Sequence, residues 1–158
     1  MIIKWVGCGL LLGVAFAYSL TVWRRMHSLA VQQEGWIELL TYVRGQISCF
    51  GTPLQDILAT VDKAILEKTG LYACDGEEFS SLCHRGAHSL GGEWETILSS
   101  LGNEIGTIWR AEQVERLDDY IQTMQKKKTA FSSVWRDRVR LHATLSVCLA
   151  LAIILLVW

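Results

Sequence analysis

Charged residues are confined to the middle of this chain, and their distribution limits what it can fold into. All 16 acidic residues lie between Glu34 and Asp137, and only Lys4 of the 15 basic residues lies outside the stretch from Arg24 to Arg140. The two ends are therefore almost free of charge. We expect a chain of this kind to place its ends in an apolar environment and its middle in water.

The N-terminal apolar stretch, residues 5–23, predicts a membrane-spanning helix. It has no charged residue, and a helix of this length would reach about 28 Å, close to the thickness of a hydrocarbon core. A tryptophan stands at each end, where the membrane interface favours it, and Arg24 and Arg25 follow directly. Ala15 and Ala17 also have the spacing of a signal-peptidase site, so a cleaved signal peptide is the alternative interpretation.

The C-terminal stretch, residues 143–158, is also uncharged and predicts a second membrane-spanning helix. It would reach only about 24 Å, so it needs preceding residues or a thin bilayer to cross fully. Basic residues and histidines flank both stretches on the side of the middle segment, at positions 24, 25, 27, 136, 138, 140 and 142. The positive-inside rule then predicts that residues 24–142 are cytoplasmic and that both termini lie outside.

Apolar residues of the middle segment recur at steps of three and four, which is typical of amphipathic helices. No strand pattern is present. The predicted fold class is therefore all-α, an antiparallel bundle of about five to six helices between the two membrane helices. The first of these helices is predicted to continue the first span to about Phe50, with its core-facing residues at Trp36, Leu39, Leu40, Val43 and Ile47.

Turn residues predict where the second helix begins and ends. Thr52 is predicted to be its N-cap, Pro53 its first residue, and Gln55 the partner of Thr52 in a capping box. The helix is predicted to run to Thr69 and to stop at Gly70. Its predicted core-facing residues are Leu54, Ile57, Leu58, Val61 and Ile65.

The remaining helices are predicted from the same periodicity. Two short ones lie at about residues 77–89 and 93–101, separated by a pair of glycines, and a further break covers residues 102–106. One long helix then runs from about Ile108 into the second span. The core-facing residues predicted for these helices are Phe79, Leu82, Cys83, Trp94, Ile97, Leu98, Leu101, Val114, Leu117, Ile121, Met124, Phe131 and Trp135.

Several classes of function find no support in this sequence. The middle segment has 14 basic residues (15 less Lys4) and 16 acidic ones, so it lacks the basic excess of a nucleic-acid-binding surface. It contains no Walker lysine loop and no nucleophile elbow. Five cysteines, two of them in the apolar ends, do not form a disulfide framework. We predict no enzyme activity, no cofactor and no nucleic-acid partner.

Cys74, Cys83, His84 and His88 form the one cluster of metal-ligand types. His84 and His88 are four residues apart and share a helix face, but Cys83 points about 100° away from His84. The cluster has no C-x-x-C or H-E-x-x-H motif, so we predict no metal site. A small membrane-anchored metal-dependent enzyme centred on Cys83, His84 and His88 is the alternative.

Two motifs, in this order and within this layout, resemble the stage III sporulation protein AB family of endospore-forming bacteria. Residues 47–54 end in Gly-Thr-Pro-Leu, which is similar to a turn of the family. A second motif is similar to the family's G-x-x-L-G with a downstream Arg and Gln, although isoleucine replaces the leucine, and residues 71–92 match poorly. The second motif supplies the candidate interaction surface, Gly102, Ile105, Gly106, Arg110 and Gln113.

The resemblance implies a structural role. The family belongs to a membrane assembly of the mother cell that links it to the forespore, and its cytoplasmic domain looks like those of type II secretion and type IV pilus platform proteins. This implies docking of the secretion-type ATPase of the same operon, stage III sporulation protein AA, contact with other subunits of the complex, and location in the mother-cell membrane around the forespore. A two-span sensor or accessory protein is a further alternative.

Overall fold

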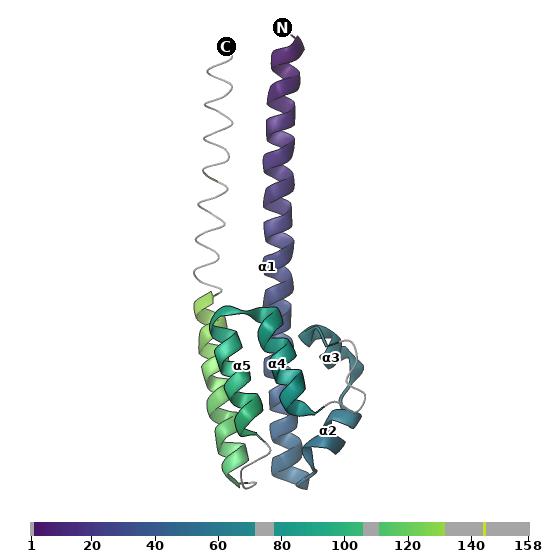
Figure 1. Ribbon diagram of the computed structural model, residues 1–158, viewed down its shortest axis with the longest axis vertical. Coiled ribbons are helices and arrows are strands. Elements are labelled where there is room, and N and C mark those ends of the chain that lie inside the picture. The colour runs from purple at the N-terminus through teal and green to yellow at the C-terminus, as the bar shows by residue number, and fades with distance from the viewer. Residues whose placement is uncertain (1, 72–77, 106–110, 132–143, 145–158) are drawn as a thin grey trace. The chain divides into compact units, whose positions relative to one another are not determined.

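The computed structural model describes residues 2–71, 78–105, 111–131 and 144, and the side chains of residues 2–12, 14 and 15 are outside this description. Every regular element in the described residues is a helix, which confirms the all-α fold class (Figure 1). The helices are α1 (Ile2–Phe50), α2 (Leu54–Thr60), α3 (Lys63–Thr69), α4 (Phe79–Leu90) and α5 (Gly92–Glu104), and residues 111–131 form a sixth.

The chain divides into two compact units. One is Leu29–Lys128, and the other combines Met1–Ser28 with Thr129–Trp158. Within the described residues, none of the helices combines the length and the apolar character that crossing a membrane requires. Apart from Thr144, the predicted span at residues 143–158 lies outside the described residues, as do several side chains of the predicted span at residues 5–23.

The core of the unit Leu29–Lys128 forms around the second half of α1. The prediction that this helix continues unbroken to Phe50 is confirmed. The predicted apolar stripe of this helix is confirmed as well, because all five of its residues are buried. Their exposed fractions are Trp36 0%, Leu39 0%, Leu40 0%, Val43 0% and Ile47 3%.

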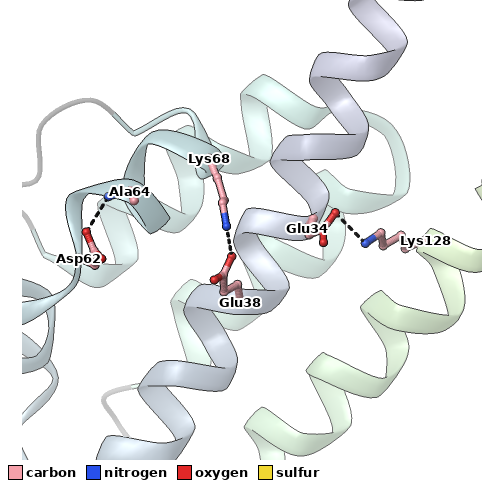
Figure 2. A network of polar contacts seen from close by, with 6 residues as sticks. All are labelled: Glu34, Glu38, Asp62, Ala64, Lys68 and Lys128. Atoms are coloured by element: carbon pink, nitrogen blue, oxygen red, sulfur yellow. Dashed lines mark hydrogen bonds and ion pairs between the residues drawn. The ribbon is translucent and has the colours of Figure 1, made fainter.

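The helix predicted from Thr52 to Thr69 is wrong, because the chain forms two short helices there. Val61 has an extended backbone (φ −61°, ψ 137°) and ends α2, while its side chain remains buried. Asp62 then caps α3, its carboxylate accepting a hydrogen bond of 2.9 Å from the Ala64 N–H (Figure 2). The aspartate satisfies a free amide at the helix start and favours the new helix over continuation of the old one.

The predicted capping box at Thr52 is also wrong. Pro53, with φ −60° and ψ 144°, itself occupies the N-cap position of α2, and no side chain caps this helix. Thr52 therefore lies one residue too far from the helix to perform that function. The predicted stop at Gly70 is confirmed. Its positive φ of 82° ends α3, and its backbone N–H donates a hydrogen bond to the carbonyl oxygen of Glu67.

Replacing Asp62 with alanine should lower the free energy of unfolding by about 1 kcal/mol, the usual cost of losing an N-cap. Thr52→Ala is the matched control and should change it little, since Thr52 caps no helix. Denaturant titration of the full chain, followed by circular dichroism, measures both. A loss at Thr52 with none at Asp62 would contradict the assignment of the caps.

Helices α4 and α5 pack against each other as a hairpin joined at Gly91 (Figure 1). Gly91 has φ 64° and ψ −179°, a conformation that favours glycine, so the predicted break at this position is confirmed. Residues of both helices that were predicted to face the core are buried or partly buried. They are Phe79, Leu82, Cys83, Trp94, Ile97, Leu98 and Leu101.

The last described helix, residues 111–131, confirms part of the predicted long helix. Leu117, Ile121 and Met124 are buried on its inner face, and Val114 is partly buried against the same core. The predicted core residue Trp135 and the predicted continuation into the second span lie outside the described residues. Within Leu29–Lys128, the helices thus enclose one apolar core.

Candidate interaction surface

The five residues of the predicted interaction surface lie in different environments. Gly102 is buried in α5 and Ile105, just after it, is 5% exposed, so both belong to the core. Gln113 is half-buried at the start of the last described helix, while Gly106 and Arg110 lie outside the described residues. The role of this segment as an interaction surface stays a prediction. Gly102 and Ile105 contribute no exposed side chain to such a surface.

Gly102 was predicted to interrupt the helix, and this prediction is wrong. Helix α5 continues through Gly102 to Glu104, and the backbone becomes extended only at Ile105. A Cβ atom at position 102 would lie 2.8 Å from Cβ of Cys83 and 3.3 Å from the carbonyl oxygen of Ser80, both on α4. The glycine therefore lets α4 and α5 approach closely, and this packing compensates for its poor helix propensity.

The described residues of the metal-ligand cluster lie in different surroundings. Cys83 is 0% exposed, and burial raises the pKa of its thiol, so the thiolate that a metal would require is disfavoured. His84 and His88 are exposed on the outer side of the same helix, and Cys74 lies outside the described residues. In the described part of the chain, no three His, Cys, Asp or Glu residues gather where they could hold an ion.

Ion pairs join different helices in the described part of Leu29–Lys128, and sequence reasoning did not find them. Helix α1 pairs with α3 through Glu38 and Lys68, at 2.8 Å, and with the last described helix through Glu34 and Lys128, at 3.2 Å (Figure 2). Two further pairs are Arg44 with Asp118 and Lys127 with Glu93. Sequence analysis alone does not identify such partners, because each pair joins helices distant in sequence.

These pairs involve two charged runs of the last described helix. Asp118 binds Arg44 at 2.8 Å. Lys127 and Lys128 are paired with Glu93 and Glu34 of this chain. All of these side chains remain partly solvated, so each pair stabilises the fold only modestly and mainly fixes which helix faces meet.

Tyr120 joins the last described helix to the end of α5. Its hydroxyl donates a hydrogen bond to the carboxylate of Glu104. Burial, then this hydrogen bond and the negative charge of Glu104, raise the pKa of Tyr120 from 10.0 to about 12. The neutral hydroxyl is the form that the folded chain stabilises.

The raised pKa predicts a loss of stability in alkaline solution. Between pH 10 and about pH 12, Tyr120 loses its proton in the unfolded chain before it does so in the folded one. The stabilisation is therefore complete below pH 10 and falls as the pH rises through this interval. Denaturant midpoints measured from pH 9 upward should fall less steeply for Tyr120→Phe than for the natural chain. Parallel curves would show that Tyr120 does not contribute.

The first half of α1 exposes large apolar side chains. Phe16 is 68% exposed, Tyr18 71%, Val22 38% and Trp23 51%. The hydroxyl of Thr21 donates a 2.9 Å hydrogen bond to the carbonyl of Ala17 within the same helix, so this polar group needs no water. This part of the helix therefore has an apolar surface on which the Thr21 hydroxyl is satisfied within the helix.

Comparison with known protein families identifies the family of this chain. The stage III sporulation protein AB family matches residues 4–158, nearly the whole chain. The chain belongs to this family. It is thus a stage III sporulation protein, and its family is not one of known enzymes. No curated protein and no solved structure matches the chain at a significant level.

The family match covers both segments that carry the resemblance, residues 47–54 and the candidate surface at residues 102–113. In the first segment, Ile47 is buried and Phe50 is 75% exposed at the end of α1. In the second, the described residues change from buried at Gly102 and Ile105 to half-buried at Gln113. Each segment thus combines residues that build the core with residues that a partner could reach.

Proposed function

We propose that this chain is a non-enzymatic platform subunit of the sporulation membrane complex that links mother cell and forespore, and that its helical domain docks the ATPase stage III sporulation protein AA. The observation that carries the proposal is the two-part character of α1. It is one unbroken helix of 49 residues. The stripe residues from Trp36 to Ile47 are buried in the core of a protein domain, whereas Phe16, Tyr18, Val22 and Trp23 expose apolar side chains.

The exposed apolar residues of α1 support membrane anchoring. At 100° per residue, Phe16 and Trp23 share one side of the helix, and Tyr18 lies about 160° around from Phe16. A helix packed on a water-soluble core would hide its apolar residues on one side. Apolar side chains on opposite sides instead favour lipid around the helix. The proposal places residues 5–23 and 143–158 in the mother-cell membrane and the helical domain in the cytoplasm.

A docking role is supported by the chemistry of the described side chains. The one cysteine buried in the described core, Cys83, has a thiol that burial keeps protonated, which does not suit a nucleophile. His84 and His88 are exposed on α4. A small helical domain held close to a membrane acts most simply by binding another protein, and the family match supports a partner among sporulation proteins. We choose the ATPase because the family's cytoplasmic domain resembles those of secretion platform proteins.

The proposal predicts that a tagged full chain captures the ATPase from detergent-solubilised membranes of sporulating cells. Arg110 and Gln113 lie three residues apart, and both residue types form specific polar contacts at interfaces. Changing both to alanine should weaken capture by about tenfold or more, the effect of losing one strong contact. The thermal midpoint of the purified full chain should stay nearly unchanged.

The control variant carries Lys63→Ala and Gln55→Ala, which also removes one cation and one amide. Both residues are exposed on α3 and α2, and this variant should capture the ATPase as the natural chain does. Unchanged capture by the Arg110 and Gln113 variant would place the docking surface elsewhere. If the natural chain captures other subunits of the complex but no ATPase, the proposed ATPase docking is wrong and the platform role remains.

A further inference from the structure

Trp23, Arg24, Arg25 and His27 form a ring of exposed side chains around α1, directly after its exposed apolar residues. We propose that this ring binds the headgroup phosphates of anionic phospholipids and so gives the membrane anchor a preference for anionic bilayers. The inference rests on the membrane anchoring proposed above, and it adds the class of lipid and the residues that recognise it.

The two arginines have no partner within the described chain. The nearest acidic residue along α1 is Glu34, which pairs with Lys128, and neither Arg24 nor Arg25 takes part in an ion pair among the described residues. Arginine at an exposed site can form forked, charge-assisted hydrogen bonds with phosphate. Two neighbouring exposed guanidinium groups are thus available to bind an anion from outside the described residues.

The arrangement of the ring favours a bilayer over a protein partner. At 100° per residue, the two arginines lie 100° and 200° from Trp23, and His27 lies 40° from it, so the four side chains span about 200° of the circumference. A protein groove would contact one side of a helix, whereas a helix passing through a headgroup layer meets phosphates all around it. From Trp23 to His27 the axial rise is about 6 Å, which equals the thickness of one headgroup layer, about 5–8 Å.

The aromatic residues of the ring are also suited to this layer. Trp23 is 51% exposed, and its ring lies edge-on to the His27 imidazole at a centroid distance of 5.7 Å. An indole has an apolar body and one N–H donor, and such rings are enriched at membrane interfaces. The four side chains from Trp23 to His27 therefore combine an interfacial aromatic anchor with two cations suited to phosphate, all at the same depth.

The test uses the full chain, synthesised without cells in the presence of vesicles and then floated on a density gradient. One set of vesicles contains phosphatidylcholine alone, and the other contains about one third phosphatidylglycerol. Each arginine near an anionic surface should favour binding by about fivefold, so the natural chain should prefer the anionic vesicles by up to about 25-fold at low salt. Added salt should reduce this preference.

Arg24→Gln with Arg25→Gln should lose most of the preference, and Arg24→Lys with Arg25→Lys should keep much of it. The matched control, Lys63→Gln with Arg116→Gln, removes two exposed cations elsewhere and should behave as the natural chain. An equal preference in the Arg24 and Arg25 glutamine variant would overturn the inference. So would loss of the preference on adding soluble glycerol phosphate at matched ionic strength, because the ring would then bind free phosphate.

The two proposals can fail separately in this experiment. A chain that floats equally well with both kinds of vesicle is anchored, and only the lipid preference is wrong. A chain that floats with neither kind contradicts the membrane anchoring itself and the lipid preference with it. A chain that floats with both kinds of vesicle and prefers the anionic ones supports both proposals.

Discussion

Replacing Trp36 with alanine should lower the free energy of unfolding by about 3–5 kcal/mol, the usual cost of removing a large side chain from a packed core. The Trp36 side chain is 0% exposed in the middle of the buried stripe of α1. Its indole N–H has no hydrogen-bond partner in the described chain, so the loss is one of packing. A cost of this size is a large share of the total stability of a small domain.

The matched control is Phe50→Ala, which removes an aromatic ring that is 75% exposed on the same helix. It should change the free energy of unfolding by less than about 0.5 kcal/mol. Both variants are measured in the full chain by denaturant titration at constant detergent concentration. Equal effects of the two changes would contradict the assignment of Trp36 to the core.

Gly86 on α4 provides a second test of the same contact. A Cβ atom at position 86 would overlap the indole of Trp36. Gly86→Ala should therefore destabilise the natural chain and cost much less in the Trp36→Ala chain, where the methyl group enters the space that the indole has left. The two changes together should be at least 1 kcal/mol less destabilising than the sum of the single changes, as is common for residues in contact. Additive effects would show that Gly86 and Trp36 do not meet.

Periodicity predicted the buried face of α1 correctly because it reports a local property. Each stripe residue, from Trp36 to Ile47, is covered as the steps of three and four indicate. The interruption at Val61 escaped this reasoning, since an apolar residue at the expected inward position is compatible with one helix or with two. Asp62 was the signal available: it precedes the second helical stretch as an N-cap residue should.

Properties that depend on contacts between distant segments were not predictable in this way. Gly102 looks like a helix breaker in sequence, yet the close approach of α4 at Cys83 makes glycine the residue that fits there. The ion pair between Arg44 and Asp118 joins residues 74 positions apart, and spacing within one helix cannot identify such a partner. The candidate interaction residues were chosen from a motif, and burial removes Gly102 and Ile105 from the exposed surface.

Two glycines of α1, Gly35 and Gly45, should respond in opposite directions to replacement by alanine. A Cβ atom at Gly35 would lie 2.7 Å from both the carbonyl carbon of Lys68 and the amide nitrogen of Thr69. These are backbone atoms at the end of α3, so relief requires moving one helix away from the other. A Cβ atom at Gly45 would meet nothing within 4 Å.

Gly45→Ala should therefore raise the free energy of unfolding by about 0.5–1 kcal/mol, the gain in helix propensity. Gly35→Ala has the same gain in propensity but overpacks the contact with α3, and its net effect should be a loss of about 2 kcal/mol or more. Movement of α3 should also separate Lys68 from Glu38, so Glu38→Gln should cost less stability in the Gly35→Ala chain than in the natural one. If both glycine changes stabilise the chain, α1 and α3 do not approach each other at Gly35.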